Sequence, residues 1–309
     1  MKVIVAHVSP DLDAIASIWV IRKFLPGWNE AEVKFVLAGE RLEGSYSRNE
    51  IDGPIEKIGE VEVIHVDTGL GKFDHHHLKN ENVCAASLAF DYIKETIPEQ
   101  LKPDKIKTEA VEKLIGYTLI DDHFQQVYYK EPQSYLYDFL LFGVIDGFCL
   151  QYPKNDVGCI DFGTKCLDAV FHTLENRIWA QREIEEKGIE FETRWGKGLG
   201  IETVNDVTLE LSQRMGYVVV ARKDPSSGAV RIKAWPERIE PGIEFPISDL
   251  KSPKADLTQA YEMFRKMDPD ASWFLHVSKK MLLNGSTKDP SAKRTRLSLK
   301  EVIEVLESI

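Results

Sequence analysis

Six of the eight histidines in this chain fall in three short segments that also contain aspartates. The segments are His7–Asp13, His65–His77 and Asp121–His123. Imidazole and carboxylate groups together suit Mn²⁺, Co²⁺, Zn²⁺ or Fe²⁺, whereas Mg²⁺ prefers shells made of oxygen ligands alone. The three segments therefore indicate a binding site for metal ions of the manganese class.

Each segment taken alone also has an ordinary structural explanation. Ser9–Asp11 is how many helices begin, with a capping residue, a proline in the first turn and an acid favoured by the helix dipole. The adjacent acids at 121–122 are typical of a solvated helix end. Helix capping does not explain His7. Asp74–His77 are four adjacent titratable residues after a buried strand, and such a cluster is unfavourable unless it binds ions. We therefore favour the metal site.

The elements that must position these residues alternate between strands and helices. In chain order we expect a strand at Lys2–Ala6, a helix at Ala14–Phe24 and strands at Glu32–Ala38 and Val61–Val66. This order is typical of an α/β fold with a doubly wound parallel sheet, which binds ligands beyond the carboxyl ends of its strands. His7 and Asp67 each follow a valine-rich strand, so we expect both at that edge.

The rest of the chain predicts a helical extension and a smaller second α/β domain. Helical spacing of apolar residues marks Ala86–Ile97, Thr108–Ile120, Tyr135–Leu150 and Asp161–Lys187. The glycine-rich stretch Lys187–Asp206 is the expected connection between domains. Further elements are expected at Tyr217–Arg222 and Val230–Trp235 as a hairpin, Leu257–Lys266 as a helix, Trp273–Val277 as a strand and Leu299–Ser308 as a closing helix. We therefore predict a metal-binding domain at residues 1–190 and a substrate-binding domain at residues 205–309.

Composition limits the class of protein. A hydrophobic content of 43% and a charged content of 29% exclude a disordered or fibrous chain. Apolar runs such as Phe139–Val144 are too short to cross a bilayer, and the first residues lack the features of a signal peptide. We therefore expect a cytoplasmic protein with no membrane partner. The formal net charge of -11 argues against coating of nucleic acid by bulk electrostatics, but it allows a local basic pocket.

The four cysteines have neither CxxC spacing nor the density of a disulfide framework. They are Cys84, Cys149, Cys159 and Cys166. Free cysteine packs as a small hydrophobic residue, so we expect four buried, reduced thiols.

The order of the three histidine and aspartate segments resembles the signature of the DHH phosphoesterases. That signature has a histidine before a Pro-Asp-x-Asp-Ala motif, an aspartate at a strand end, an Asp-His-His triplet and a later aspartate. Here His7–Ala14, Asp67, Asp74–His76 and the acids at 121–122 match it in order. The superfamily includes exonucleases, nanoRNases and family II pyrophosphatases. The spacing of seven residues from Asp67 to Asp74 is similar to that of its melanocyte-proliferating-gene (Myg) branch.

The likeness to this branch extends over nearly the whole chain. Further similar segments are Ala85–Ser87, Tyr217–Trp235, Trp273–His276 and Asn284–Lys288. Two features differ. The last of these segments has one glycine where the branch has two, and Ser9–Asp13 is closer to the general DHH pattern.

The resemblance implies two divalent metal ions, most simply Mn²⁺. The implied ligands are His7, Asp11, Asp13, Asp67, His75 and Asp121. His7 and Asp11 would bind one ion, Asp13 and His75 the other, and Asp67 would bridge both. Asp121 would complete the second ion, with the adjacent Asp122 as the open alternative. Two such ions can share a water, lower its pKa and stabilise the attacking and leaving oxygens of an in-line displacement.

The resemblance also implies roles for the residues beside these ligands. Asp74 would orient a histidine by a hydrogen bond, and His76 would face the phosphate as a donor or an acid. His77 has no assigned partner.

The C-terminal domain is expected to hold the substrate. Seven basic residues lie between Lys279 and Lys300, opposed within that stretch only by Asp289. A Gly/Ser loop beside them can present N–H groups and positive charge to phosphate. The candidate substrate-binding residues are His276, Asn284, Gly285, Ser286, Lys288 and Arg294. The alternatives are a solvated surface loop and, for His276, a core histidine.

The leading hypothesis is a phosphodiesterase, a 3′–5′ exonuclease that acts on short or single-stranded RNA or DNA. The alternative enzyme is a phosphatase or pyrophosphatase that acts on a small phosphorylated metabolite. A binding protein that has lost catalysis is disfavoured because every expected ligand position is filled. The sequence leaves the oligomeric state open, with a homodimer as one option.

Overall fold

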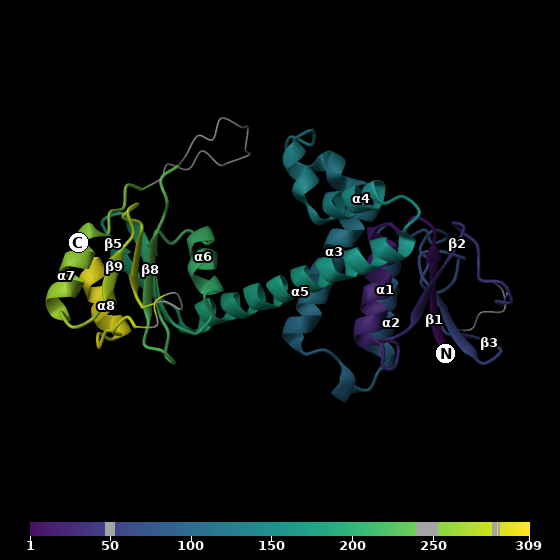
Figure 1. Cartoon of the computed structure of the whole chain (residues 1–309), viewed down its shortest axis with the longest axis horizontal. Coiled ribbons are helices and arrows are strands. Elements are labelled where there is room, and N and C mark those ends of the chain that lie inside the picture. Colours follow the sequence, from purple (N-terminus) through teal and green to yellow (C-terminus); the bar gives the residue numbers. More distant parts are fainter. Residues whose placement is uncertain (47–52, 239–252, 286–288, 290) are drawn as a thin grey trace. The chain divides into compact units, whose positions relative to one another are not determined.

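The structure is a computed structural model that describes residues 1–46, 53–238, 253–285, 289 and 291–309. It divides into two compact units, Met1–Glu175 and Asn176–Ile309, and each unit contains its own sheet (Figure 1). Among the described residues, no helix is both long and apolar enough to cross a membrane.

The first unit is built on a four-stranded sheet with strand order β2-β1-β4-β3. The strands are β1 (Lys2–His7), β2 (Glu32–Val36), β3 (Glu56–Ile58) and β4 (Val61–His65). β1 pairs in parallel with both β2 and β4, while β3 adds an antiparallel edge. Val3 to Ala6 are fully buried, as expected for a central parallel strand that is covered on both faces. The parallel α/β arrangement expected from the sequence is confirmed.

Helices form a large part of the first unit. They are α1 (Leu12–Phe24), α2 (Ala85–Thr96), α3 (Lys105–Asp122) and α4 (Leu141–Gln151), with 3-10 turns η2 (Glu99–Leu101), η3 (Gln125–Tyr128) and η4 (Tyr135–Phe139). α1 is apolar around most of its circumference, and such a helix belongs in a core. It is buried from Leu12 to Ile21 and packs against α2 and α3 (Figure 1).

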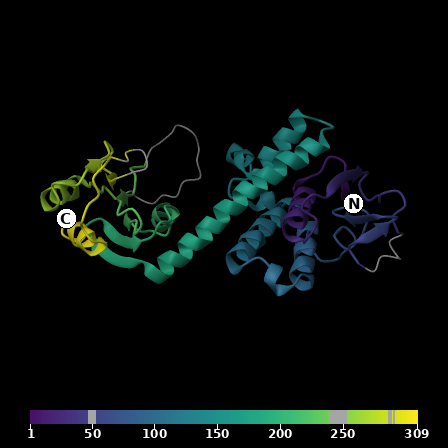
Figure 2. The ribbon, with the colours of Figure 1, turned by 60° about the horizontal axis from the view of Figure 1, so that its bottom comes forward.

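The long helix α5 (Asp156–Lys187) begins in the first unit and ends in the second (Figures 1 and 2). In the first unit it packs closely on α1 because Gly163 has no side chain. A Cβ added at Gly163 would lie 2.7 Å from Cγ2 of Ile15. Trp19 of α1 also donates a hydrogen bond to Asp168 of α5 (2.9 Å). These contacts fix the helix that Asp11 caps and whose first turn carries Asp13.

The second unit has a six-stranded sheet with strand order β5-β6-β7-β8-β10-β9. Its strands are β5 (Ile189–Thr193), β6 (Gly196–Glu202), β7 (Val219–Lys223), β8 (Val230–Ala234), β9 (Trp273–Leu275) and β10 (Met281–Asn284), and its helices are α6 (Val207–Arg214), α7 (Thr258–Met267) and α8 (Leu299–Glu307). Side chains alternate along β7. Val219 packs in a core with residues of α7 and α8, and Val220 packs with residues of α5 and α6. The expected hairpin of β7 and β8 is confirmed by their antiparallel pairing.

The stretch Lys187–Asp206, which the sequence predicts as a connection, instead contains strands β5 and β6. Its glycines serve packing. A Cβ at Gly200 would lie 2.5 Å from Cδ1 of Ile303, so the absence of a side chain lets α8 lie on the sheet. The boundary between the units falls inside α5, at Glu175 and Asn176.

The expectation of four reduced thiols also differs from the structure. Cys149 of α4 and Cys159 of α5 form a disulfide, with their Cα atoms 5.6 Å apart. Cys84 and Cys166 are free, and only Cys84 of these two is buried. Sequence spacing does not reveal the pair, because the turn between two helices brings the two residues together.

Candidate metal centre

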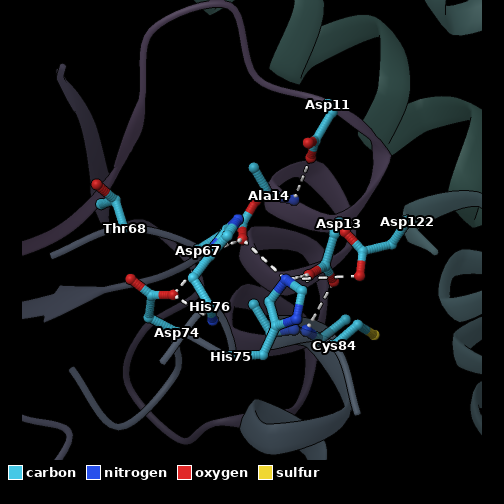
Figure 3. A network of polar contacts seen from close by, with 12 residues as sticks. Asp11, Asp13, Ala14, Asp67, Thr68, Asp74, His75, His76, Cys84 and Asp122 are labelled. Carbon is cyan, nitrogen blue, oxygen red and sulfur yellow. Dashed lines mark hydrogen bonds and ion pairs between the residues drawn. The ribbon is translucent and has the colours of Figure 1, made fainter. Parts of the chain in front are cut away.

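The loop after β4 holds Asp67 in a fixed position. Asp67 has a positive φ of 52°, a rare conformation for a residue with a side chain. Its N–H donates to the carbonyl of Phe73 (2.8 Å), and this bond closes the loop. Asp74 accepts from the N–H groups of Leu70 (2.6 Å) and His76 (3.0 Å). These hydrogen bonds within the loop hold it in one conformation, in which the Asp67 carboxylate lies near His75 and His76 (Figure 3).

His7, Asp11 and Asp67 form the first group of possible ligands. Nε2 of His7 lies 3.2 Å from Oδ2 of Asp67 and 3.8 Å from Oδ2 of Asp11. Asp11 is also the N-cap of α1, where it accepts from the N–H of Ala14 (3.0 Å). The capping explanation and the metal explanation are therefore compatible, because one carboxylate has lone pairs for both.

His75 is the centre of the second group. Its Nε2 lies 3.8 Å from Asp13, 3.6 Å from Asp67 and 3.5 Å from Asp122, in each case from a carboxylate oxygen (Figure 3). Asp13, in the first turn of α1, is buried against the start of α2, where it accepts from the N–H groups of Ala85 (2.6 Å) and Ala86 (2.9 Å). These bonds explain why the small residues at the start of α2 matter to the site.

The structure brings Asp122, and not Asp121, to His75. The Asp121 side chain instead accepts a hydrogen bond from the amide of Gln126. Asp122 also lies 3.5 Å from Nε2 of His123, which donates to the carbonyl of Val83 (3.1 Å). His123 is therefore positioned beside the site by the loop before α2, a contact between distant segments that the sequence does not reveal.

Three polar atoms of this site are buried without a hydrogen-bond partner. They are Oδ1 of Asp67, Nε2 of His75 and Oδ2 of Asp122. Buried polar atoms are normally satisfied, so three unsatisfied atoms around one point call for a missing partner. Both kinds of donor, imidazole nitrogen and carboxylate oxygen, are ligands of Mn²⁺-class ions. The residues present therefore fit divalent cations.

The shifted pKa values of the site residues also favour the binding of cations. Burial raises the pKa of Asp67 to about 6. Burial, together with the nearby Asp67, raises the pKa of Asp13 well above its usual value. The hydrogen bond to Asp67 raises the pKa of His7 to about 9. In the absence of ions, the protonated imidazole of His7 compensates the carboxylates, and bound cations would do so more completely.

His76 differs from His75 in exposure and in partner. Its side chain is 59% exposed, and Nδ1 lies 2.8 Å from Oδ1 of Asp74. Burial would lower the pKa of His76, but the hydrogen bond to Asp74 and nearby carboxylates raise it overall. His77 has a buried Nδ1 without a hydrogen-bond partner, and nothing in the structure explains this atom.

A buried network behind the site was not predicted from the sequence. His65 lies 3.0 Å from Glu56 through Nδ1, and its Nε2 accepts from the N–H of Leu42 (3.0 Å). Arg41 forms an ion pair with Glu56 and donates to the carbonyl of Gly69 (2.9 Å). Burial lowers the pKa of His65 to about 4, so this histidine is neutral. The network holds the turn that follows Asp67, and no motif marks it because its members come from three separate segments.

The candidate substrate-binding residues of the second unit have mixed surroundings. Asn284 is fully buried and uses its amide to donate to the carbonyls of Ser272 and Lys293 and to accept from the N–H of Thr295. Arg294 packs directly on Gly285, which has a positive φ of 84°. Nδ1 of the half-buried His276 lies 2.8 Å from the hydroxyl of Ser278. Ser286 and Lys288 lie outside the described residues.

Several of the basic residues near these candidates are paired with acids. Lys279 pairs with Asp256 (3.3 Å), and Lys280 pairs with Glu237 (3.3 Å). Arg296 lies 3.6 Å from Asp268. These pairs reduce the positive charge that this stretch offers to a polyanion.

No protein-family model matches the sequence, and a search of curated proteins finds no match. Among solved structures, the chain is similar to a DHH-domain protein that is described as a member of a family of ribosomal proteins. The identity is 12% and the TM-score 0.30, over 99% of this chain and 86% of that one. It is also similar to an exopolyphosphatase-related protein from Bacteroides fragilis, with 12% identity and a TM-score of 0.22 over 99% of this chain and 90% of that one. Scores this low carry no argument about function, which rests on the site itself.

Proposed function

We propose that this chain is a phosphoesterase of the DHH type that uses two divalent metal ions. The observation that carries the proposal is the position of Asp67 between two groups of ligands. One of its oxygens faces His7 (3.2 Å) and the other faces His75 (3.6 Å). A carboxylate shared in this way is what a site with two adjacent ions requires.

The proposed ligands form two sets around the shared carboxylate. His7 and Asp11 belong to the first ion, and Asp13, His75 and Asp122 belong to the second. Asp122 replaces Asp121 in this assignment because of its position beside His75. Nδ1–H of His7 donates to the carbonyl of Val8 (2.9 Å), which would leave Nε2 to bind metal. Mn²⁺ is the proposed ion.

When bound, the two ions would supply a water of lowered pKa and positive charge for the phosphoryl oxygens. The side chains of the chain do the rest. Asp74 holds Nδ1 of His76, which leaves Nε2 of that ring to donate to a phosphate oxygen or to the leaving group.

The proposed substrate is a phosphodiester of short, single-stranded nucleic acid, cleaved from one end. The resemblance to the Myg branch supports this proposal. A phosphatase acting on a small phosphorylated metabolite is the second candidate. The ion pairs of Lys279, Lys280 and Arg296 favour it, because they leave fewer cations for a substrate with many phosphates.

Metal loading and hydrolysis test the proposal together. Protein loaded with Mn²⁺ should hold two ions per chain and hydrolyse bis-p-nitrophenyl phosphate and dinucleotides. Asp67→Asn should lose both ions and activity, because both share this ligand. Asp161→Asn is the matched control, since this exposed aspartate of α5 is not among the proposed ligands and pairs with Lys165 (3.1 Å). Elemental analysis showing at most one ion, or full activity in EDTA, would refute the two-metal proposal.

A further inference from the structure

A cavity of about 800 Å³ opens directly from the proposed ligands of the second ion. Asp13, His75 and Asp122 line it, together with residues of η3, η4 and α4 and of the segments between them. A volume of this size accommodates a small molecule or one nucleoside. The cavity belongs wholly to the first unit.

Four aromatic residues also line the cavity. Two of the lining residues are held in place by their neighbours. Phe142 stacks on Tyr117, and Tyr137 donates to the carbonyl of Lys130 (2.5 Å). Phe124 and Tyr135 also line the cavity, and they are 78% and 48% exposed. Phe124 has a positive φ of 52°, which is strained for a bulky residue. An exposed phenylalanine in a strained backbone beside a cavity points to a ligand that covers its ring.

The charge of the cavity limits what it can hold. Beyond the proposed ligands, Asp121, Asp138 and Asp146 line it. No lysine or arginine does so within the part of the chain that the structure describes. Two cations would compensate the carboxylates that bind them, but these three would keep the cavity negative. The cavity would therefore repel a phosphate while its carboxylates accept hydrogen bonds from N–H donors.

We propose that this cavity binds the nucleoside whose phosphate lies at the metal ions, and that it rejects a nucleoside bearing a second phosphate. The inference rests on the proposed function. Aromatic rings stack on any base, and carboxylates accept from the amino groups of bases. The enzyme would accordingly act at an end of the nucleic acid that lacks a terminal phosphate and would release a nucleoside monophosphate.

Binding measurements on the Mn²⁺-loaded full chain test this assignment without depending on catalysis. The probes are adenosine 5′-monophosphate, adenosine 3′-monophosphate, ribose 5-phosphate and adenosine 3′,5′-bisphosphate, each titrated by calorimetry. One of the two monophosphates should bind about ten-fold tighter than ribose 5-phosphate, because the base adds a stacking contact. The bisphosphate should bind about three-fold or more weaker than that monophosphate, because its second phosphate meets the carboxylates.

Variants separate the two parts of the assignment. Tyr135→Leu should bring the affinity for the monophosphate close to that for ribose 5-phosphate. Phe124→Asn should act in the same direction, since asparagine tolerates a positive φ and removes the ring. Asp138→Asn should reduce the discrimination against the bisphosphate, whereas Asp161→Asn, which changes the charge outside the cavity, should leave all four affinities unchanged.

The outcomes distinguish this inference from the proposed function. A monophosphate that binds no tighter than ribose 5-phosphate, or a bisphosphate that binds equally well, would overturn the cavity assignment even if diesters are hydrolysed. Binding as expected without hydrolysis of any diester would uphold the cavity assignment and refute the phosphodiesterase.

Discussion

Asp121 and Asp122 are neighbours in the chain, yet they face different parts of the site. Successive residues of an α-helix point about 100° apart, so only one of two adjacent acids at the end of α3 can face His75. Sequence spacing places the pair near the candidate metal site but does not fix the rotation of the helix. Packing of α3 on α1 fixes it, and Asp122 faces the histidine.

This difference makes the two acids a matched pair for mutagenesis. Asp122→Asn should lose the second ion, because it removes a charged ligand next to His75. Asp121→Asn should retain both ions, because its carboxylate is bonded to Gln126. Metal content by elemental analysis after Mn²⁺ loading and gel filtration checks this. Retention of two ions by Asp122→Asn, with loss in Asp121→Asn, would identify Asp121 as the ligand.

A second pair of variants separates a ligand from an acid. His76→Ala should keep both ions, because the exposed ring is held by Asp74, while its turnover of a model diester falls about 10²–10⁴-fold. His75→Ala should lose the second ion. Turnover and metal content must be measured on the same preparations. The reverse pattern would shift the assignment of the two histidines by one residue.

Positions at strand ends and at a helix start predict that His7, Asp11, Asp13 and Asp67 lie near one another. His75 lies in the loop after β4, and only the resemblance to the DHH signature predicts its place beside Asp67 and Asp13. The Arg41, Glu56 and His65 network could not be predicted. Its contacts join a loop, an edge strand and β4, and depend on the tertiary fold alone.

Runs of β-branched residues predict the strands of the first unit well, whereas glycines mislead in the second unit. β1, β2 and β4 are short, valine-rich and parallel, as predicted. β5 and β6 were missed because glycine normally weakens a strand and the stretch that holds them is rich in glycine. Close contacts explain the glycines of β6, since a Cβ at Gly198 would meet Phe191 of β5 and a Cβ at Gly200 would meet Ile303 of α8. The meaning of a glycine therefore depends on its neighbours in space.

Gly163 of α5 and Gly147 of α4 differ in the space around them. Gly163→Ala should destabilise the protein by about 1–2 kcal/mol, because the clash with Ile15 exceeds the gain in helix propensity. Gly147→Ala in α4 is the control. An added Cβ there meets nothing within 4 Å, so stability should rise by about 0.5–1 kcal/mol. Denaturant unfolding at fixed Mn²⁺ concentration measures both. Equal effects of the two variants would mean that α5 does not pack closely on α1.

Charge is distributed unevenly along the chain. The chain carries a net charge of -11, yet seven basic residues lie between Lys279 and Lys300. If that stretch holds the further phosphates of a long substrate, replacing Lys288 and Arg294 by glutamine should weaken oligonucleotide binding far more than hydrolysis of bis-p-nitrophenyl phosphate. The wild-type rate on oligonucleotides should also fall with added salt.

The matched control for this charge change is Lys165→Gln, on an exposed position of α5 in the first unit. This variant should keep the wild-type affinity for oligonucleotides and the wild-type rate of hydrolysis of bis-p-nitrophenyl phosphate. Equal losses on both substrates in the double variant, or no loss on either, would identify the basic stretch as a solvated surface. The small-metabolite candidate would then become the better proposal.

Helix α5 also determines how this chain can be divided. Its second half places Ala180 and Ile184 in the core of the second unit, beside Leu199 and Leu209. A gene fragment that ends near residue 190, within the glycine-rich stretch, would encode the first unit with these apolar residues exposed to solvent. It would also interrupt strand β5. A cut after Glu175 leaves the hydrophobic core of each unit intact. Recombination could therefore exchange the two units intact only if the crossover point lies inside α5, and not in the glycine-rich stretch.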